Sequence, residues 1–236
     1  VAIPGGPFAR GCNAAKDSAC QANESPQRTI TLAPFWIDRR EVSHGEYLAC
    51  VQAGKCKAPA GASSTCSGPS ANPVNCIDAT AAAGYCAWRG ARLPTEAEWE
   101  KAARGGCETT EGDCLSGART WPWGEAGPSC ALADYGKCAL SKPQPVATNV
   151  GDVSIYGVLG MAGSVREWVQ DTYGSGYYAA SPATDPANLA VSDQRVVRGG
   201  SWGDVFVSDT RCGRRRVNTA SSPYSNTGIR CARSVK

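Results

Sequence analysis

The chain has 236 residues, with 24 lysines and arginines against 21 acidic residues and a formal net charge of +3. This length fits one large domain or two small ones. The near balance of charge argues against a dedicated nucleic-acid binder, which usually carries a basic stripe, and we interpret the one dense basic cluster, residues 211–216, as a strand with buried ion pairs. No apolar run approaches the roughly 18 residues of a membrane span. The chain opens on a predicted strand with no signal peptide, as a mature secreted protein or an excised domain would.

Strands are expected at the N-terminus, followed by a helix. Residues 1–11 (VAIPGGPFARG) predict a strand, a Pro-Gly-Gly turn and a second strand. Residues 28–38 (RTITLAPFWID) alternate and are rich in β-branched side chains, which is typical of a strand. Ser43 followed by Glu46 forms a capping box, which predicts a helix that extends to Gln52.

Two further helices are expected before regular periodicity ends. The second covers residues 79–89 and ends at Gly90, because glycine commonly follows the last residue of a helix. The third begins at the capping box formed by Thr95 and Glu98 and extends to Arg104.

Two long stretches are predicted to be loops. Residues 55–76 are poor in large apolar side chains, and residues 107–195 are rich in Gly, Pro, Ser and Asp. Long irregular stretches are uncommon in compact domains, so we expect disulfides, and a metal, to supply the missing order. The sequence therefore predicts one α+β domain over residues 1–236, with few helices, short strands and extensive loops.

The cysteines indicate a disulfide-rich protein. The chain has 13 of them but one histidine, His44, and no CxxC pair, whereas zinc sites usually combine such pairs with histidines. Closely spaced cysteines instead favour short disulfide loops and a secreted, periplasmic or cell-surface location. The five expected short-loop pairs are Cys12–Cys20, Cys50–Cys56, Cys66–Cys76, Cys107–Cys114 and Cys130–Cys138. Because 13 is odd, at least one thiol is free or pairs with another chain.

Many ordered motifs are shared with one known family. They include IPGGPF (3–8), RLPTEAEWE (92–100), GSVREW (163–168), RGGSW (198–202) and GIRCAR (228–233). On these motifs the chain resembles the sulfatase-modifying-factor, or formylglycine-generating-enzyme, family over nearly its whole length. The resemblance implies an α+β variant of the C-type lectin fold with a small twisted antiparallel sheet, two or three helices and extensive loops. It also implies a disulfide between Cys86 and Cys231.

The resemblance implies metal chemistry whose ligands this sequence lacks. Formylglycine-generating enzymes hold copper on two cysteines shortly after the Gly-Gly-Ser motif, and the matching positions here are Asp204 and Asp209. Carboxylates are hard ligands that do not suit Cu(I). Hercynine oxygenases of the same family hold iron on three histidines, whereas this chain has only His44, which we expect to be half-exposed and without function. We therefore expect neither copper nor iron.

Cys212 is the expected free thiol. It falls where the resemblance places a structural cysteine, but the position of the usual partner, near Ala103, is alanine. A disulfide between Cys212 and Cys107, or a catalytic role for Cys212, are the alternatives.

Other members of the family have kept the fold as a binding scaffold. In some of these, the segment that corresponds to residues 203–227 forms the ligand-binding surface. Tyrosine and arginine are favoured anchors in such surfaces. The expected binding residues are Trp202, Asp204, Phe206, Asp209, Arg211, Arg214, Arg216 and Tyr224. We expect a protein or peptide ligand, or a carbohydrate, and no nucleic acid.

Calcium is the one cofactor that the resemblance leaves open. A site at Gly163, Val165 and Glu167 would use the Glu167 side chain and backbone carbonyls, as a hard cation requires. The chain departs from the family at two nearby positions, Gly160 and Ser164. The alternative is that Glu167 pairs with an arginine or caps backbone N–H groups.

A second calcium site would use Asp134 and the carbonyl of Tyr135, but the loop that completes it is shortened. The expected function is thus a secreted, disulfide-stapled binding module that lacks the copper cysteines. The alternative is an oxidoreductase or peptide-modifying enzyme with an altered site at Asp204, Asp209 and Cys212, like relatives that act in siderophore maturation.

Overall fold

The structure is a computed structural model that describes residues 1–61, 66, 68–110, 112–138 and 142–235. Both predicted loops include residues outside this part of the chain, namely 62–65 and 67 in the first loop and 111 and 139–141 in the second. Lys236 of the predicted domain also lies outside it.

The N-terminal strands form two small sheets. Strand β2 (Gly6–Arg10) pairs antiparallel with β3 (Arg28–Leu32), and β4 (Phe35–Ile37) lies between β1 (Ala2–Ile3) and β9 (Ala232–Ser234). The single strand expected over residues 28–38 is therefore wrong. It is divided at Ala33-Pro34, because proline has no backbone N–H to donate to a ladder, and its two halves join different sheets.

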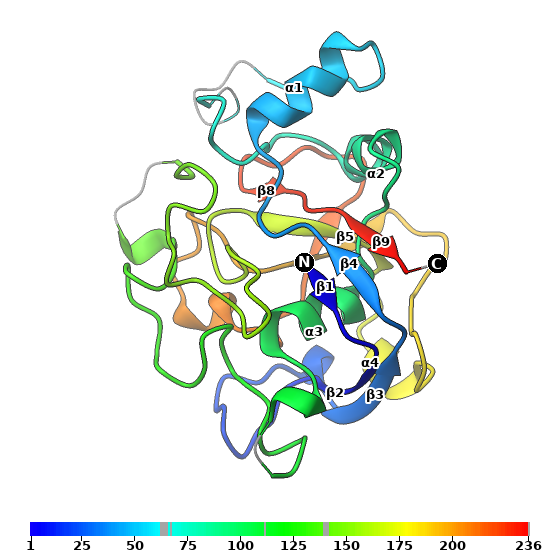
Figure 1. Ribbon diagram of the computed structural model, residues 1–236, viewed down its shortest axis with the longest axis vertical. Helices are drawn as coiled ribbons and strands as arrows, with labels where there is room; N and C mark the ends of the chain where they lie inside the picture. Colours follow the sequence, from blue (N-terminus) through cyan, green and yellow to red (C-terminus); the bar gives the residue numbers. More distant parts are fainter. Residues whose placement is uncertain (62–65, 67, 111, 139–141, 236) are drawn as a thin grey trace.

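Three helices lie close to their predicted limits. They are α1 (His44–Gln52), α2 (Ala79–Trp88) and α3 (Glu96–Arg104). Both predicted capping boxes are present, since the Ser43 and Thr95 side chains each accept from the N–H three residues on. All nine residues of α3 are buried, and Figure 1 shows this helix in the centre of the molecule, whereas α1 projects at one end.

The third sheet carries the segment of functional interest. Its strands are β5 (Arg166–Thr172), β6 (Gln194–Arg198), β7 (Arg216–Thr219) and β8 (Thr227–Gly228), in the order β7-β6-β5-β8. The described residues thus form three small sheets where the resemblance implied one, and β5 pairs with β8 in parallel. Sequence periodicity missed β5 because five of its seven residues are buried, on both faces of the strand.

Short helical turns complete the described elements. They are α4 (Tyr177–Ala180), η1 (Ala22–Glu24), η2 (Cys107–Thr109), η3 (Gly136–Cys138) and η4 (Val207–Thr210). In the part of the chain that the structure describes, no helix is long and apolar enough to cross a membrane.

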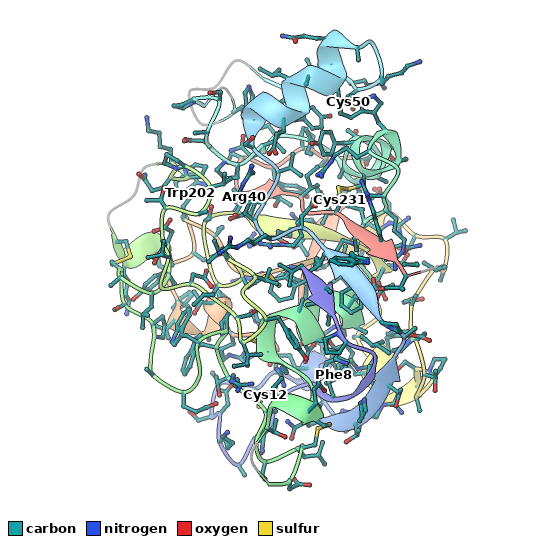
Figure 2. All side chains as sticks on the ribbon, in the orientation of Figure 1. Phe8, Cys12, Arg40, Cys50, Trp202 and Cys231 are labelled. Atoms are coloured by element: carbon teal, nitrogen blue, oxygen red, sulfur yellow. A yellow bond between two sulfur atoms is a disulfide. The ribbon has the colours of Figure 1, made fainter. Side chains whose placement is uncertain are left out.

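Two large apolar clusters, a small third one and six disulfides hold the loops. The first cluster contains Phe8, Phe35 and Trp99, the second contains Tyr47 and Trp168, and the third contains Tyr135. The disulfides join the pairs that the sequence analysis predicted: Cys12–Cys20, Cys50–Cys56, Cys66–Cys76, Cys86–Cys231, Cys107–Cys114 and Cys130–Cys138. Figure 2 shows their spread, from Cys50 in α1 to Cys12 at the opposite end. So many disulfides favour an oxidising compartment.

Candidate functional site

The segment after β6 begins with a tight turn at Gly199 and Gly200. Both have positive φ values, 98° and 69°, which favour glycine. A Cβ atom at Gly200 would lie 2.9 Å from the Asp209 carbonyl oxygen. The turn therefore brings η4 against the end of β6, and it places Asp204 and Asp209 beneath the loop surface.

Asp204 is buried and its carboxylate is fully partnered. The guanidinium of Arg166, at the start of β5, holds both carboxylate oxygens, with Nε 3.0 Å from Oδ2 and Nη2 on Oδ1. The Ser201 hydroxyl donates to Oδ2 at 2.8 Å. An ionised carboxylate is thus compensated by a cation and a neutral donor, as burial of a charge requires.

Asp209 is 1% exposed and is compensated by two other arginines. Arg214 Nε donates to Oδ1 at 3.1 Å, and Arg216 Nη2 lies 2.5 Å from Oδ2. The same Arg216 nitrogen lies 3.9 Å from Asp204 Oδ1. Arg216 therefore links the two aspartates. Asp204, Asp209, Arg166, Arg214 and Arg216 are called the Asp–Arg cluster below.

Arg211 does not lie on the surface, as the binding-surface prediction expected. It is 2% exposed, and its Nη1 and Nη2 hold the two oxygens of Glu24 at 2.8 and 3.0 Å. It also pairs with Asp17 at 2.8 Å. The residue ties η1 to the chain beyond η4 and so supports the site from below.

A groove opens beside the cluster. Arg214, Arg216, Asn23 and Tyr173 are among the residues that line it, around a volume of about 650 Å³. Sequence analysis missed Asn23 and Tyr173, because nothing in the local pattern around them shows that η1 and the end of β5 come together. Their hydrogen bond, from Asn23 Nδ2 to the Tyr173 hydroxyl at 2.9 Å, is visible only in the fold.

Apolar side chains form a ridge between the two aspartates. Val205 and Phe206 are 53% and 66% exposed. Since η4 is held from below by Asp209, these side chains are fixed at their base and project outwards. An exposed aromatic residue on a held loop is typical of a binding surface.

Trp202 and Tyr224 lie at the border of this surface. Figure 2 shows Trp202 among the loops on one side of the molecule. Its backbone N–H donates to the Ser164 carbonyl at 2.8 Å. Tyr224 packs against the buried Trp168, with ring centroids 6.2 Å apart. Both are half-buried, so Phe206 is the more accessible aromatic residue.

Cys212 is a free and fully buried cysteine. Burial raises the pKa of its thiol to about 12, although Arg104 and Arg198 act in the opposite direction. A thiol with so high a pKa is neutral at physiological pH, and the neutral form is a poor nucleophile and a poor metal ligand. The alternative pairing is also excluded, because Cys107 is joined to Cys114.

The donor set does not fit copper or iron. At the two positions that the resemblance assigns to copper, hard carboxylates are engaged with guanidinium groups, and Cu(I) prefers soft sulfur. His44 is 8% exposed, so the expectation of a half-exposed histidine is wrong; burial at the start of α1 lowers its pKa. Among the described residues, one group of three metal-capable side chains lies close together, Cys12, Cys20 and Glu24, and its sulfurs are in a disulfide.

The calcium ligands expected around Glu167 have other partners. Arg230 Nε and Nη2 each lie 2.7 Å from an oxygen of Glu167, and Trp99 Nε1 also donates at 2.7 Å. This is the arginine pairing that the sequence analysis gave as the alternative. Calcium at Gly163, Val165 and Glu167 stays a prediction.

The second expected calcium site is likewise occupied by protein donors. The Ser164 N–H donates to the Asp134 carbonyl at 2.8 Å, and the Cys138 N–H donates to the Tyr135 carbonyl at 2.9 Å.

A second ion-pair network holds the cluster in place. Arg198, at the end of β6, contacts Glu96 at 3.2 Å and Glu100 at 2.7 Å, both on α3. Arg215 holds both oxygens of Glu96, at 2.7 and 2.9 Å. The predicted buried ion pairs of residues 211–216 are therefore present, but the strand expected there is wrong, since only Arg216 of this range lies in β7. The ion pairs fasten the segment that carries Arg214 and leads into β7 to the central helix.

The fold and motifs have counterparts among known proteins. Residues 1–235 match the family described as sulfatase-modifying factor enzyme 1-like domain. The formylglycine-generating enzyme of Thermomonospora curvata is 32% identical over 98% of this chain and 92% of its own length. The hercynine oxygenase of Mycolicibacterium smegmatis is 31% identical over 86% of this chain and 54% of its own. Among solved structures, PvdO from Pseudomonas aeruginosa is similar with a TM-score of 0.81 at 26% identity, covering 100% of this chain and 94% of that one.

Proposed function

The chain belongs to the sulfatase-modifying factor enzyme 1-like domain family, and within it we propose that this protein is a disulfide-stapled binding module of an extracytoplasmic compartment, without the copper chemistry of formylglycine-generating enzymes. One observation carries the proposal. Arg166, Arg214 and Arg216 compensate the charges of Asp204 and Asp209, the residues at the positions that the resemblance assigns to the copper ligands. Such a cluster stabilises the loop and leaves no soft donor for Cu(I).

The Asp–Arg cluster also supports a role in ligand binding. It holds η4 from below, so that Val205 and Phe206 stay exposed on a loop fixed at its base. A loop held in its bound conformation loses little entropy when a ligand binds. The groove beside it carries two partly exposed arginines, Arg214 and Arg216, whose guanidinium groups suit backbone carbonyls or carboxylates of a ligand.

The ligand that fits this surface is a protein or peptide segment. Phe206 and Val205 would contact an apolar side chain, and Arg214 and Arg216 would contact polar groups next to it. Aromatic and arginine residues together are typical of protein-binding surfaces. A carbohydrate is the alternative outcome of the binding experiment below.

The first experiment tests for catalysis. Purified protein is incubated with Cu(I), oxygen and a cysteine-containing peptide, with the Thermomonospora curvata enzyme as positive control, and the peptide is analysed by mass spectrometry for aldehyde. We expect no aldehyde above the protein-free level. Aldehyde formed in proportion to enzyme concentration would refute the proposal.

The second experiment tests recognition. Phe206→Ser and Arg214→Gln are compared with the wild type on peptide and glycan arrays, and Val191→Ser serves as matched control because Val191 is fully exposed outside the groove. We expect the two site variants to lose binding to the same ligand and the control to keep it. Equal binding by all four proteins would place recognition elsewhere.

A second candidate function is favoured by the relatives named above, two of which are enzymes. It is an oxidoreductase or peptide-modifying enzyme with an altered site at Asp204, Asp209 and Cys212. Metal analysis of the purified protein discriminates the two. A redox metal bound stoichiometrically, and lost on Asp204→Asn, would favour the enzyme.

A further inference from the structure

A second groove lies where the outer face of the β1-β4-β9 sheet meets the segment that follows α2. Its volume is about 800 Å³, and it shares no lining residue with the groove beside the Asp–Arg cluster. Figure 1 shows β4 and β9 side by side, with α2 close to them. The ligand site proposed above therefore does not account for this groove.

Trp36 forms the apolar part of the groove. It lies on β4 between Phe35 and Ile37, which are 1% and 2% exposed, whereas Trp36 itself is 50% exposed. Successive residues of a strand point to opposite faces, so Phe35 and Ile37 enter the core while Trp36 faces the solvent. Tryptophan is usually much more buried than this. An aromatic ring on a paired strand offers a flat apolar surface to a ligand.

Arg233 lies directly across the sheet from Trp36. The two residues are opposite each other in the antiparallel register of β4 and β9, and Arg233 is exposed. Its Nη2 donates to the Arg89 carbonyl at 2.7 Å, and it has no carboxylate partner among the described residues. The Cβ atoms of such opposite residues lie about 5 Å apart, so one ligand can contact both side chains.

The other charged side chains of the groove are already paired. Arg89 Nη1 lies 2.9 Å from Asp38 Oδ2, and Arg92 Nη2 lies 2.6 Å from Glu98 Oε1. Arg89, Asp38 and Arg92 are each about one-third exposed, so they still offer donors and acceptors to a ligand. Within the described part of the chain, the lining side chains therefore carry one uncompensated positive charge, that of Arg233.

The backbone around the groove has little free edge for a peptide strand. The Ala232 N–H donates to the Arg92 carbonyl at 2.7 Å, and the Ala232 carbonyl accepts from the Arg92 N–H at 2.9 Å. Beyond Ala232, β9 contains only Arg233 and Ser234. Since an extended peptide binds a sheet edge through free backbone groups, this edge does not favour a peptide ligand.

We propose that this groove binds an acidic saccharide, with a sugar ring packed on Trp36 and the sugar carboxylate paired with Arg233. One face of a sugar ring consists of C–H groups and suits an indole ring. Its hydroxyl groups both donate and accept hydrogen bonds, as the Arg89–Asp38 pair requires. Arginine binds carboxylates through two parallel hydrogen bonds. An aromatic surface with a few fixed polar groups is typical of a small-molecule site.

Saccharide binding is tested by titration calorimetry on the intact, disulfide-bonded protein. The titrants are trisaccharides of glucuronate, galacturonate or sialate, and a glucose trisaccharide serves as the neutral counterpart of glucuronate. We expect at least one acidic saccharide to bind, and to bind about tenfold more tightly than the neutral one, because only the acidic sugar offers a carboxylate to Arg233.

Variants locate the site. Trp36→Ala and Arg233→Gln should each weaken this binding by about tenfold, and Arg233→Gln should also remove the preference for the acidic sugar, which misfolding alone would not do. Trp88→Ala is the matched control, because Trp88 is 42% exposed and lies outside the lining. Phe206→Ser should likewise keep the binding, which separates this site from the function proposed above. Urea unfolding checks that every variant is folded.

Several results would overturn the proposal. They are a wild type that binds none of the three acidic saccharides, equal binding of the acidic and neutral sugars, and binding that both Trp36→Ala and Arg233→Gln retain. Loss of binding in Phe206→Ser alone would place the saccharide in the first groove. A peptide of glutamate residues is the competitor. If it displaces the saccharide as well as free saccharide does, the groove recognises charge alone and the proposal is wrong.

Discussion

Two pairs of buried carboxylates in this chain have opposite surroundings. Asp204 and Asp209 are surrounded by three arginines and a serine hydroxyl. Glu41 and Asp152 are buried to a similar degree, yet among the described residues three of their four oxygens lack a hydrogen-bond donor. Every oxygen of the first pair lies beside an arginine, although Asp209 Oδ2 has an ion pair and no hydrogen bond. Arg230, the buried cation near the second pair, is already paired with Glu167.

This difference teaches that the residue type alone does not identify a metal site. All four residues are acidic, and the two aspartates stand at the positions that family resemblance assigns to metal ligands. Arginines supplied by β5 and by the segment that leads into β7 pair with the two aspartates and take the place that a metal ion would have.

The largest expected effect is the loss of Arg230. Arg230→Gln leaves Glu167 without its cation and adds a third unbalanced carboxylate next to Glu41 and Asp152. Removing one partner of a buried pair costs about 3–5 kcal/mol, so the free energy of unfolding in urea should fall by that amount. Arg233→Gln, on the exposed edge of β9, should change it by less than about 0.5 kcal/mol. Equal losses of stability in Arg230→Gln and Arg233→Gln would show that burial of the Arg230–Glu167 pair does not determine its contribution.

The pH dependence of stability should separate the two pairs. Burial raises the folded-state pKa values of Glu41 and Asp152 to about 7 and about 8, above the ordinary 4.5 and 3.8. The folded protein then binds protons more tightly than the unfolded one, so stability is greatest at acid pH and falls as pH rises from about 4 to about 8. The contribution of Glu41 is about 3 kcal/mol.

Thermal unfolding across this range measures the effect. Burial also raises the pKa of Asp171 to about 7, so Asp171 contributes to the pH dependence of the wild-type melting temperature. The same contribution is present in Glu41→Gln, so the difference between the two proteins reports the titration of Glu41. If the difference in melting temperature between wild type and Glu41→Gln does not vary with pH, the raised pKa of Glu41 is contradicted.

Neutralising one acid from each pair should change stability in opposite directions. Asp209→Asn removes the charge that Arg214 and Arg216 compensate, and we expect a loss of about 1–3 kcal/mol. Glu41→Gln removes a buried charge that Arg230 compensates only in part, because Arg230 is paired with Glu167. We expect a gain of about 1 kcal/mol, which is smaller than the cost of ionising Glu41 because the buried amide also needs hydrogen-bond partners. Urea unfolding at pH 8 measures the free energy of unfolding of both variants. If both lose stability by the same amount, the two pairs do not differ in how their charges are compensated.

The smallest effect is expected at an exposed ion pair. Lys16 and Glu125 lie 3.5 Å apart, with 31% and 49% of their side chains exposed. Exposed pairs contribute about 0–1 kcal/mol. Lys16 also donates to the Ser116 and Ala118 carbonyls at 3.0 and 3.2 Å, so Lys16→Met should lower the free energy of unfolding in urea by about 1 kcal/mol at most. A loss as large as that of Asp209→Asn would mean that solvent screening is weaker than assumed here.

The sequence by itself determined the local features of this protein. Capping boxes at Ser43 and Thr95 set the starts of two helices, because the side chain and the backbone donor that it satisfies lie within four residues. Short cysteine spacings predicted five disulfides, and the motif resemblance implied the long-range pair Cys86–Cys231. Cys212 remained as the odd thiol, as the structure has it.

Only the tertiary structure decided which charges meet. Arg166 is 38 residues from Asp204 in sequence, and Arg211 is 187 residues from Glu24. No local pattern encodes such pairs, so Arg211 was expected on the surface, and Asn23 and Tyr173 were missed. Glu41 and Asp152 gave no signal either, since only the fold shows that both carboxylates are buried while the nearby Arg230 pairs with Glu167.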